Sequence, residues 1–270
     1  MPGTKLRSYV RYLPLYGCIS TAMIYFGIGT VAILSFFKLK DGGADETSLL
    51  AFLNEYILGK LFVWAILIGT VAYIIWRVYE AITDPYDYGS TAVGLSKRIG
   101  IAASTVADIL IAYSAILILL GASNVRVDGN PEQDRQMVRD LLGHSWGSAV
   151  VVLLGGIIFI SAGVQLLYGT TRGYKERLDI AHFSVTMKHL IHFFGLTGYV
   201  ARGIILGIVG FFFVKAGVLK DHNYVVNTDK AFDFIGDNVG HASFILVAAG
   251  TICYALFMVA LGLTYDANKD

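Results

Sequence analysis

Two charged residues, Asp108 and Arg202, lie inside long apolar stretches of the sequence. A charge at the centre of a membrane-spanning helix costs about 2.5–3.5 kcal/mol on insertion scales, so each residue is expected to have a partner. The two residues belong to two copies of a repeated sequence pattern. When the copies are aligned, Asp108 lies four positions further along its span than Arg202, which is a helical rise of about 6 Å. An Asp108–Arg202 ion pair inside a helix bundle is therefore predicted. Such a pair could form a substrate or proton site, or it could lock two parts of the bundle together.

Three histidines form a second candidate site. If the segment around them is helical, His182, His189 and His192 fall within about 80° of arc, and imidazoles so placed could bind a metal or haem. The alternative is that His192 is a basic anchor at the membrane interface. We favour the anchor and predict neither a metal nor a cofactor.

Two short motifs resemble enzyme signatures. Residues 143–147 spell G-x-S-x-G, but a hydrolase needs a strand before this motif and acid and histidine partners on a sheet, whereas here a membrane span follows it. Residues 27–32 resemble a dinucleotide fingerprint but lie within an apolar helix. Cys18 and Cys253 also lie in predicted spans and are interpreted as small buried residues. We therefore predict that the protein is not an enzyme.

The composition indicates which elements position these residues. Of 270 residues, 56% are hydrophobic and 15% are charged, whereas a soluble domain has about 25% charged residues. A net charge of +1 excludes a strongly basic nucleic-acid-binding protein, and two cysteines exclude a disulfide scaffold. An all-α membrane protein embedded in a lipid bilayer is predicted.

A helix needs about 20 apolar residues to cross the hydrocarbon core. Six stretches qualify as transmembrane helices: 13–37, 61–82, 99–120, 146–168, 193–214 and 241–265. Six spans place both termini on one side, and Lys5, Arg7 and Arg11 precede the first span without any acidic residue. This pattern of cations predicts cytoplasmic termini.

The spans form three copies of one pattern within a single integral-membrane domain, residues 1–270. The first helices of the three copies align at Gly17, Gly100 and Gly198, and their second helices follow Gly59, Gly147 and Gly240. The repeat units are residues 8–85, 97–170 and 190–266, each with an amphipathic outer segment at 45–58, 131–145 or 228–239. Three two-helix repeats predict a pseudo-threefold bundle.

Small residues recur in the spans. Gly203 and Gly207 form a small-xxx-small pattern, and Gly155 and Gly156 are adjacent in another span. Because small side chains let helix backbones approach closely in lipid, we expect these glycines to serve helix packing.

The best copy of the repeat, Gly-Tyr-Val-Ala-Arg-Gly at 198–203, and the sequence Tyr-Ile-Ile-Trp-Arg at 73–77 resemble a bacterial membrane family catalogued as domain of unknown function 1206. The resemblance covers nearly the whole chain. It implies three tandem two-helix repeats in a bacterial cytoplasmic membrane, and it implies no particular activity. Thr21 and Ser104 occupy the positions that correspond to Arg202, so the first two units depart from the pattern.

Chemically reactive residues are sparse, and the outer segments offer surfaces for other membrane proteins. We therefore predict a non-enzymatic accessory or scaffold subunit of a membrane assembly, with protein partners bound through the outer amphipathic segments. The alternative is a small transporter or channel that uses Asp108 and Arg202. Transporters commonly contain broken helices and inverted repeats, whereas the repeats here are parallel and the spans contain no proline in their interiors.

Overall fold

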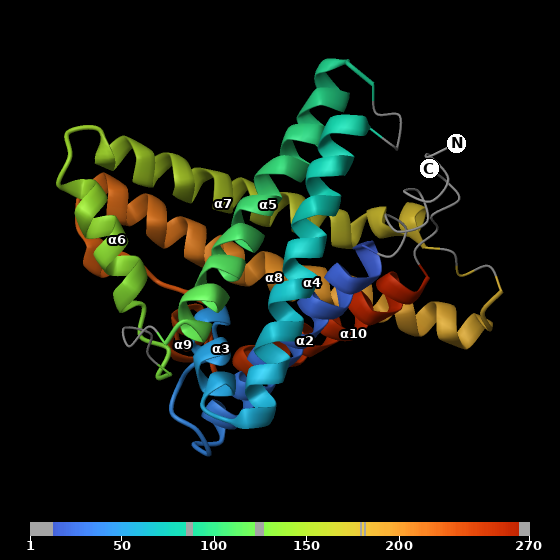
Figure 1. Cartoon of the computed structure of the whole chain (residues 1–270), viewed down its shortest axis with the longest axis horizontal. Coiled ribbons are helices and arrows are strands. Elements are labelled where there is room, and N and C mark those ends of the chain that lie inside the picture. Colours follow the sequence, from blue (N-terminus) through green and yellow to red (C-terminus); the bar gives the residue numbers. More distant parts are fainter. Residues whose placement is uncertain (1–12, 85–88, 122–126, 179, 181, 265–270) are drawn as a thin grey trace.

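The computed structural model describes residues 13–84, 89–121, 127–178, 180 and 182–264, and for several residues of α5 it describes only the helical backbone. The described chain is helical throughout (Figure 1). Its α-helices are α2 (Leu13–Phe36), α3 (Glu46–Asn54), α4 (Ile57–Thr83), α5 (Ala92–Leu119), α6 (Glu132–Leu142), α7 (Gly147–Thr170), α8 (Val185–Leu219), α9 (Thr228–Asn238) and α10 (His241–Leu263). Two short 3-10 helices are η1 (Gly173–Arg177) and η2 (His222–Tyr224).

Five helices are long and apolar enough to cross a membrane: α2, α4, α7, α8 and α10. Their backbone hydrogen bonds are satisfied within each helix, which a segment in lipid requires. The predicted span at 99–120 is helical as α5 but is not among these five, so the total of six spans is not confirmed.

The three amphipathic outer segments are the short helices α3, α6 and α9. The Asp45 side chain caps α3 by accepting hydrogen bonds from two backbone N–H groups, and the Asn227 side chain caps α9 by accepting one from the Lys230 N–H. The loops next to these helices also meet: Lys40 donates to the Val127 carbonyl (3.3 Å), and Asn227 donates to the Gly129 carbonyl (3.1 Å). The outer segments therefore lie together at one end of the protein (Figure 1).

The long helices pack in a series that does not follow their order in the chain. α5 packs on α4, α4 on α2, α2 on α10, α10 on α8 and α8 on α7. Figure 1 shows α4 and α5 as a pair that is steeply inclined to α7 and α8. A closed pseudo-threefold bundle would also need extensive packing of α5 on α7. The helix pairings of the described residues do not include it, so threefold closure is not confirmed.

Glycines at matching repeat positions explain part of this packing. Gly69 lies ten residues after Gly59, in the first turn of α4, and Gly250 lies ten residues after Gly240, which precedes α10. A methyl group on Gly69 would lie 2.6 Å from Ser20 Cβ, and one on Gly250 would lie 2.6 Å from Ala201 Cβ. The first and second helices of these two units can therefore approach closely. The matching residue of the second unit is Ile157, and there the two helices separate.

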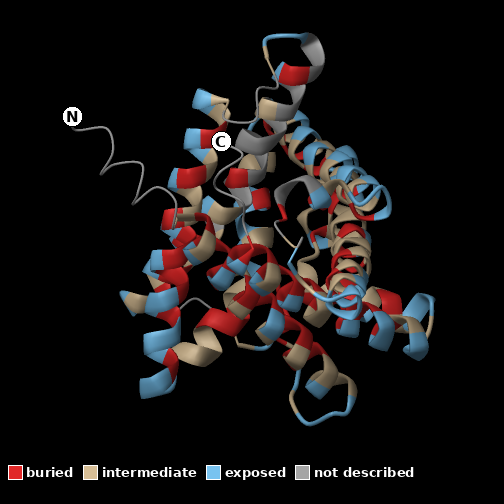
Figure 2. Ribbon diagram, turned by 90° about the vertical axis from the view of Figure 1, so that its right-hand side faces the viewer, coloured by how far each residue is buried: buried red, intermediate tan, exposed pale blue. Residues whose placement is uncertain are grey.

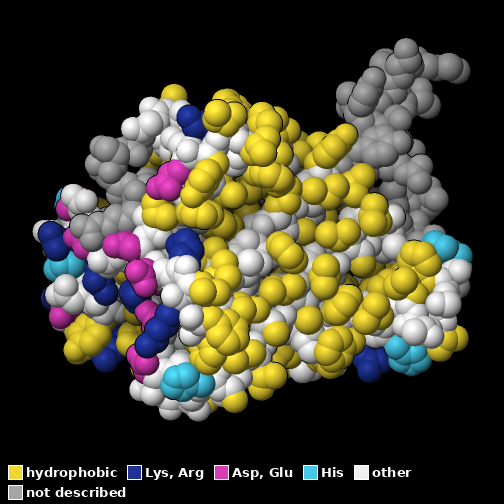
Figure 3. All heavy atoms as spheres, turned by 90° about the horizontal axis from the view of Figure 1, so that it is seen from below, with side chains coloured by type: hydrophobic (Ala, Val, Ile, Leu, Met, Phe, Trp, Pro, Cys, Tyr) yellow, Lys and Arg dark blue, Asp and Glu magenta, His cyan; other side chains and the backbone are white. Residues whose placement is uncertain are grey.

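The exterior is apolar over a broad area. Leu246, Ile160 and Ile68 are each more than 60% exposed, whereas the buried residues lie mainly along the sides where helices meet (Figure 2). Figure 3 shows a wide hydrophobic surface, with most of the charged side chains gathered near the outer helices. Such a surface is typical of a protein that contacts lipid.

Candidate functional site

Arg202 is held between two tyrosine rings in the interior. Its guanidinium lies 4.9 Å from the ring centroid of Tyr25 on α2 and 5.0 Å from that of Tyr254 on α10. Nη1 donates a hydrogen bond to the Tyr254 hydroxyl, while Nε finds no hydrogen-bond partner among the described residues. Cation–π contacts of this kind stabilise a desolvated arginine by up to about 2 kcal/mol each.

Gly198 brings these groups together. A methyl group at this position would lie 2.5 Å from Tyr254 Cα, so only glycine lets α8 approach α10 so closely at this level. Arg202 follows one turn later on α8 and reaches the Tyr254 ring. The repeat glycine thus positions the aromatic partner of the arginine.

A small cavity with several polar side chains in its lining lies beside Arg202. Its volume is about 20 Å³, which is enough for about one water molecule. Glu46, Thr228 and Thr251 line it together with Arg202 and the two tyrosines. The Glu46 carboxylate accepts a hydrogen bond from the Thr228 hydroxyl (3.2 Å). Burial raises the pKa of Glu46, whereas the Thr228 hydroxyl and the nearby Arg202 charge act in the opposite direction.

Asp108 on α5 interacts electrostatically with Arg202 and with Arg77. No ion pair of Asp108 within 4.0 Å occurs in the part of the chain that the structure describes. Arg77 itself pairs with the buried Glu80 at 3.1 Å. The structure therefore brings Asp108 and Arg202 into one neighbourhood without a direct contact, and tyrosines rather than a carboxylate contact the guanidinium.

Tyr25, Tyr254 and Glu46 were not predicted as partners of Arg202. The repeat contained a signal for the first two. Tyr25 occupies the position in its unit that Asp108 occupies in the second unit, and Tyr254 lies fourteen residues after Gly240, as Tyr73 does after Gly59. No comparable signal marks Glu46, because it lies in the first turn of an outer helix, where an acidic residue is common.

Buried carboxylates gather outside the spans, at the end that carries the outer helices. Asp229 is 3% exposed, and its Oδ1 accepts a hydrogen bond from the Ala44 N–H (2.7 Å). Burial, with a smaller contribution from the negative charges of Asp233 and Asp45, raises the pKa of Asp229 to about 6. Burial and Asp45 likewise raise the pKa of Asp134 on α6 to about 6. The described residues contain no group of three side chains placed to bind a metal.

The predicted packing glycines fall into two classes. A methyl group on Gly203 would lie 2.7 Å from Leu166, and one on Gly155 would lie 2.5 Å from the Val214 nitrogen, so both serve the close contact of α7 with α8. A methyl group on Gly207 would meet only Ala162 Cβ at 3.8 Å, and one on Gly156 would meet nothing within 4 Å. Packing within the chain does not require glycine at these last two positions.

The three histidines are not arranged as a ligand set. His189 Nδ1 contacts the Val185 carbonyl at 2.8 Å, and the ring of His192 lies 5.9 Å from that of Tyr174. The exposed His182 contacts Phe183 with its ring tilted by 49° and the ring centroids 4.4 Å apart.

Comparison with known proteins adds a family match. The model of a family described as Domain of Unknown Function (DUF1206) matches residues 16–84 and 197–264, which cover most of α2 with α3 and α4, and the later part of α8 with α9 and α10. The chain is similar to the uncharacterized protein YxxB of Bacillus subtilis (strain 168), with 27% identity and 88% of each chain covered. No solved structure gives a significant match.

Proposed function

The chain belongs to the family described as Domain of Unknown Function (DUF1206), and from this premise we propose that it is a non-enzymatic accessory or scaffold subunit of a membrane assembly. It resides in the bacterial cytoplasmic membrane with both termini in the cytoplasm. The observation that carries this proposal is an apolar face of α7 that the described helices leave uncovered. This open face of α7 consists of residues that are 41–68% exposed: Leu153, Ile157, Ile160 and Val164.

The repeat indicates what the open face of α7 binds. The matching faces of α4 and α10 contain Gly69 and Gly250, and each is covered by the first helix of its own unit. On α7 the matching residue is Ile157, and α5 packs on α4 instead. An apolar transmembrane helix of a partner subunit has the chemistry and shape to take the place of α5 there.

The size of the interior cavity supports a scaffold rather than a carrier. The cavity beside Arg202 holds about one water, whereas pockets for small molecules usually measure about 300–1,000 Å³. The arginine is already stacked on two rings. A solute with its own polar groups would need space that the described residues around Arg202 do not leave.

Site-specific crosslinking tests the proposal. A photoreactive phenylalanine analogue replaces Ile160 in the full chain in cells, and the same analogue replaces Leu246 on α10, which is comparably exposed, as a control. We expect discrete adducts with a different membrane protein from position 160 and none from position 246. Adducts with a second copy of this chain, or the absence of any protein adduct at position 160, would contradict the scaffold role.

One observation favours a second function, proton transport. Two carboxylates from different elements, Glu46 and Asp108, both interact electrostatically with Arg202, and Glu46 lines the cavity beside it, so these three groups could relay a proton. Proteoliposomes with an internal pH dye would reveal this activity. Asp108→Asn should abolish the proton flux, whereas the exposed Asp233→Asn should not. No flux in the unaltered protein would refute this function.

A further inference from the structure

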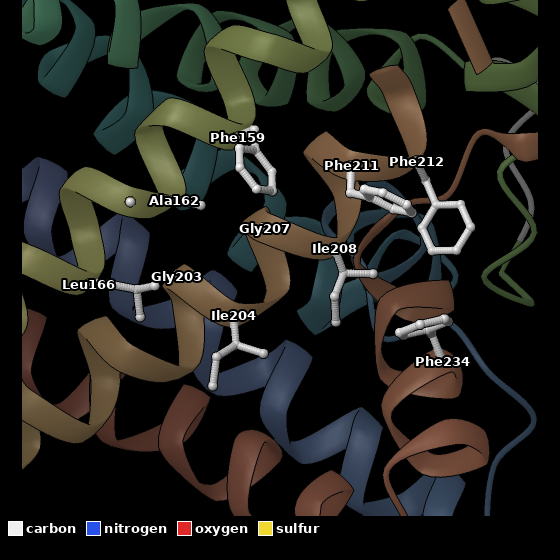
Figure 4. A pocket seen from close by; sticks show the side chains of 11 residues that line it. Phe159, Ala162, Leu166, Gly203, Ile204, Gly207, Ile208, Phe211, Phe212 and Phe234 are labelled. Carbon is white, nitrogen blue, oxygen red and sulfur yellow. The ribbon is translucent and has the colours of Figure 1, made fainter. Parts of the chain in front are cut away.

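An apolar groove runs along the α7–α8 pair. Its volume is about 400 Å³, and its lining is almost wholly apolar. Phe159 and Leu166 come from α7, Phe211 and Phe212 from α8, and Phe234 from α9. Figure 4 shows the rings of Phe211, Phe212 and Phe234 gathered at one end of the groove. The groove is large enough for a small apolar ligand.

Two glycines keep the groove open. Gly163 and Gly207 line it, yet a methyl group on Gly163 would meet nothing within 4 Å, and one on Gly207 would meet only Ala162 at 3.8 Å. Gly210, on the same helix as Gly207, differs, because its methyl group would lie 2.6 Å from the Phe159 nitrogen. The missing side chains of Gly163 and Gly207 therefore leave space that contacts within the chain do not need.

A lysine lies beyond the aromatic end of the groove. Lys215 follows Phe211 by one helical turn, and its Nζ lies 5.7 Å from the ring centroid of Phe212 and 4.1 Å from that of Tyr224. Within the described chain, no carboxylate lies within 4.0 Å of this Nζ. The apolar groove thus runs along a membrane span toward a cation near the end of that span.

We propose that this groove binds one acyl chain of an anionic phospholipid, with the headgroup phosphate paired to Lys215. The apolar lining fits the acyl chain, because the groove offers it close apolar contacts and almost no polar group that the chain would leave without a hydrogen bond. The charge of Lys215 selects an anionic headgroup, because a lysine near a bilayer surface attracts anionic lipid. From Gly203 to Lys215 the helix rises about 18 Å, so the chain lies along α8 with its headgroup at the end that carries the outer helices. This site does not depend on the scaffold role.

Native mass spectrometry of the full chain in detergent tests the proposal. The probes are phosphatidylglycerol, which is anionic, and phosphatidylcholine, which is zwitterionic, both with the same acyl chains. We expect the unaltered protein to retain phosphatidylglycerol about fivefold more than phosphatidylcholine, the effect of one lysine at a membrane surface. Lys215→Gln should bring the two lipids to the same level while both still bind.

Filling the groove provides the second test. Gly207→Leu and Gly163→Leu should lower the retention of both lipids several-fold. Gly156→Leu is the matched control, because its added side chain also meets open space but lies outside the groove. The proposal is overturned if Gly156→Leu lowers retention as much as Gly207→Leu, or if the unaltered protein retains both lipids equally. A dimer of this chain that Gly207→Leu abolishes, with unchanged lipid retention, would likewise overturn it.

Discussion

Asp229→Asn should change how stability depends on pH. Asp229 is almost fully buried at the start of α9, and its Oδ1 accepts the Ala44 N–H. Asparagine keeps that acceptor and removes only the ionisable group. The ion pair with Lys230 is also lost, but its 3.7 Å separation and exposed lysine limit this loss to less than about 1 kcal/mol.

The size of this change in stability follows from the pKa of Asp229. Burial raises the pKa of Asp229 from 3.8 to about 6, which corresponds to about 3 kcal/mol. The folded protein therefore binds this proton more tightly than the unfolded chain does. Consequently, this residue's contribution to the free energy of unfolding falls by up to about 3 kcal/mol as the pH rises from about 4 to about 6, and it is constant outside that window.

Thermal unfolding in detergent, followed by intrinsic fluorescence between pH 4 and pH 8, measures this contribution. Asp229→Asn should unfold near the temperature of the unaltered protein at pH 4 and roughly 6–12 °C higher at pH 7. Asp237→Asn, at an exposed site on the same helix, is the control and should show no such change with pH. A difference between Asp229→Asn and the unaltered protein that stays constant from pH 4 to pH 7 would refute the reasoning.

Two further predictions concern the packing around Arg202. Gly250→Leu should destabilise the protein by about 1–3 kcal/mol, because its Cβ would lie 2.6 Å from a side chain of α8. Gly156→Leu should be nearly neutral, because its Cβ would meet nothing within 4 Å. Thermal unfolding of both variants checks this prediction, and equal losses of stability would contradict it. Tyr254→Phe removes the hydroxyl that accepts from Arg202 and should cost about 1.5–3 kcal/mol. Tyr25→Phe keeps the stacked ring and should cost less in the same assay, and the reverse order would contradict the assigned contacts.

The sequence predicted most of the helices, because in a membrane the length and polarity of a segment largely determine its structure. Five of the six predicted spans are long apolar helices, and the three outer segments are helical. The packing order of the helices could not be predicted. A continuous apolar stretch shows which segments can cross the membrane. It does not show that α5 packs on α4 rather than on α7.

The candidate site was predicted only in part. Charges inside apolar stretches pointed to Asp108 and Arg202, because their cost in lipid makes them exceptional. The repeat marks the positions of Tyr25 and Tyr254, but only the fold shows that these two rings, among the many aromatic residues in the spans, contact Arg202. Glu46 lies 156 residues before Arg202, and only the packing of α3 and α9 at the end of the bundle brings its carboxylate to the cavity.

The second repeat unit connects the fold to the proposed function. Gly69 and Gly250 let the helices of the first and third units pair closely, and the family model matches those two units. Ile157 stands at the matching position of the second unit, where a branched side chain keeps a neighbouring backbone at a distance. The loss of one glycine therefore accounts both for the separation of α5 from α7 and for the apolar face that α7 presents. Because this face is wide and apolar, the proposed scaffold role places the contact with a transmembrane helix of a partner subunit at the second unit.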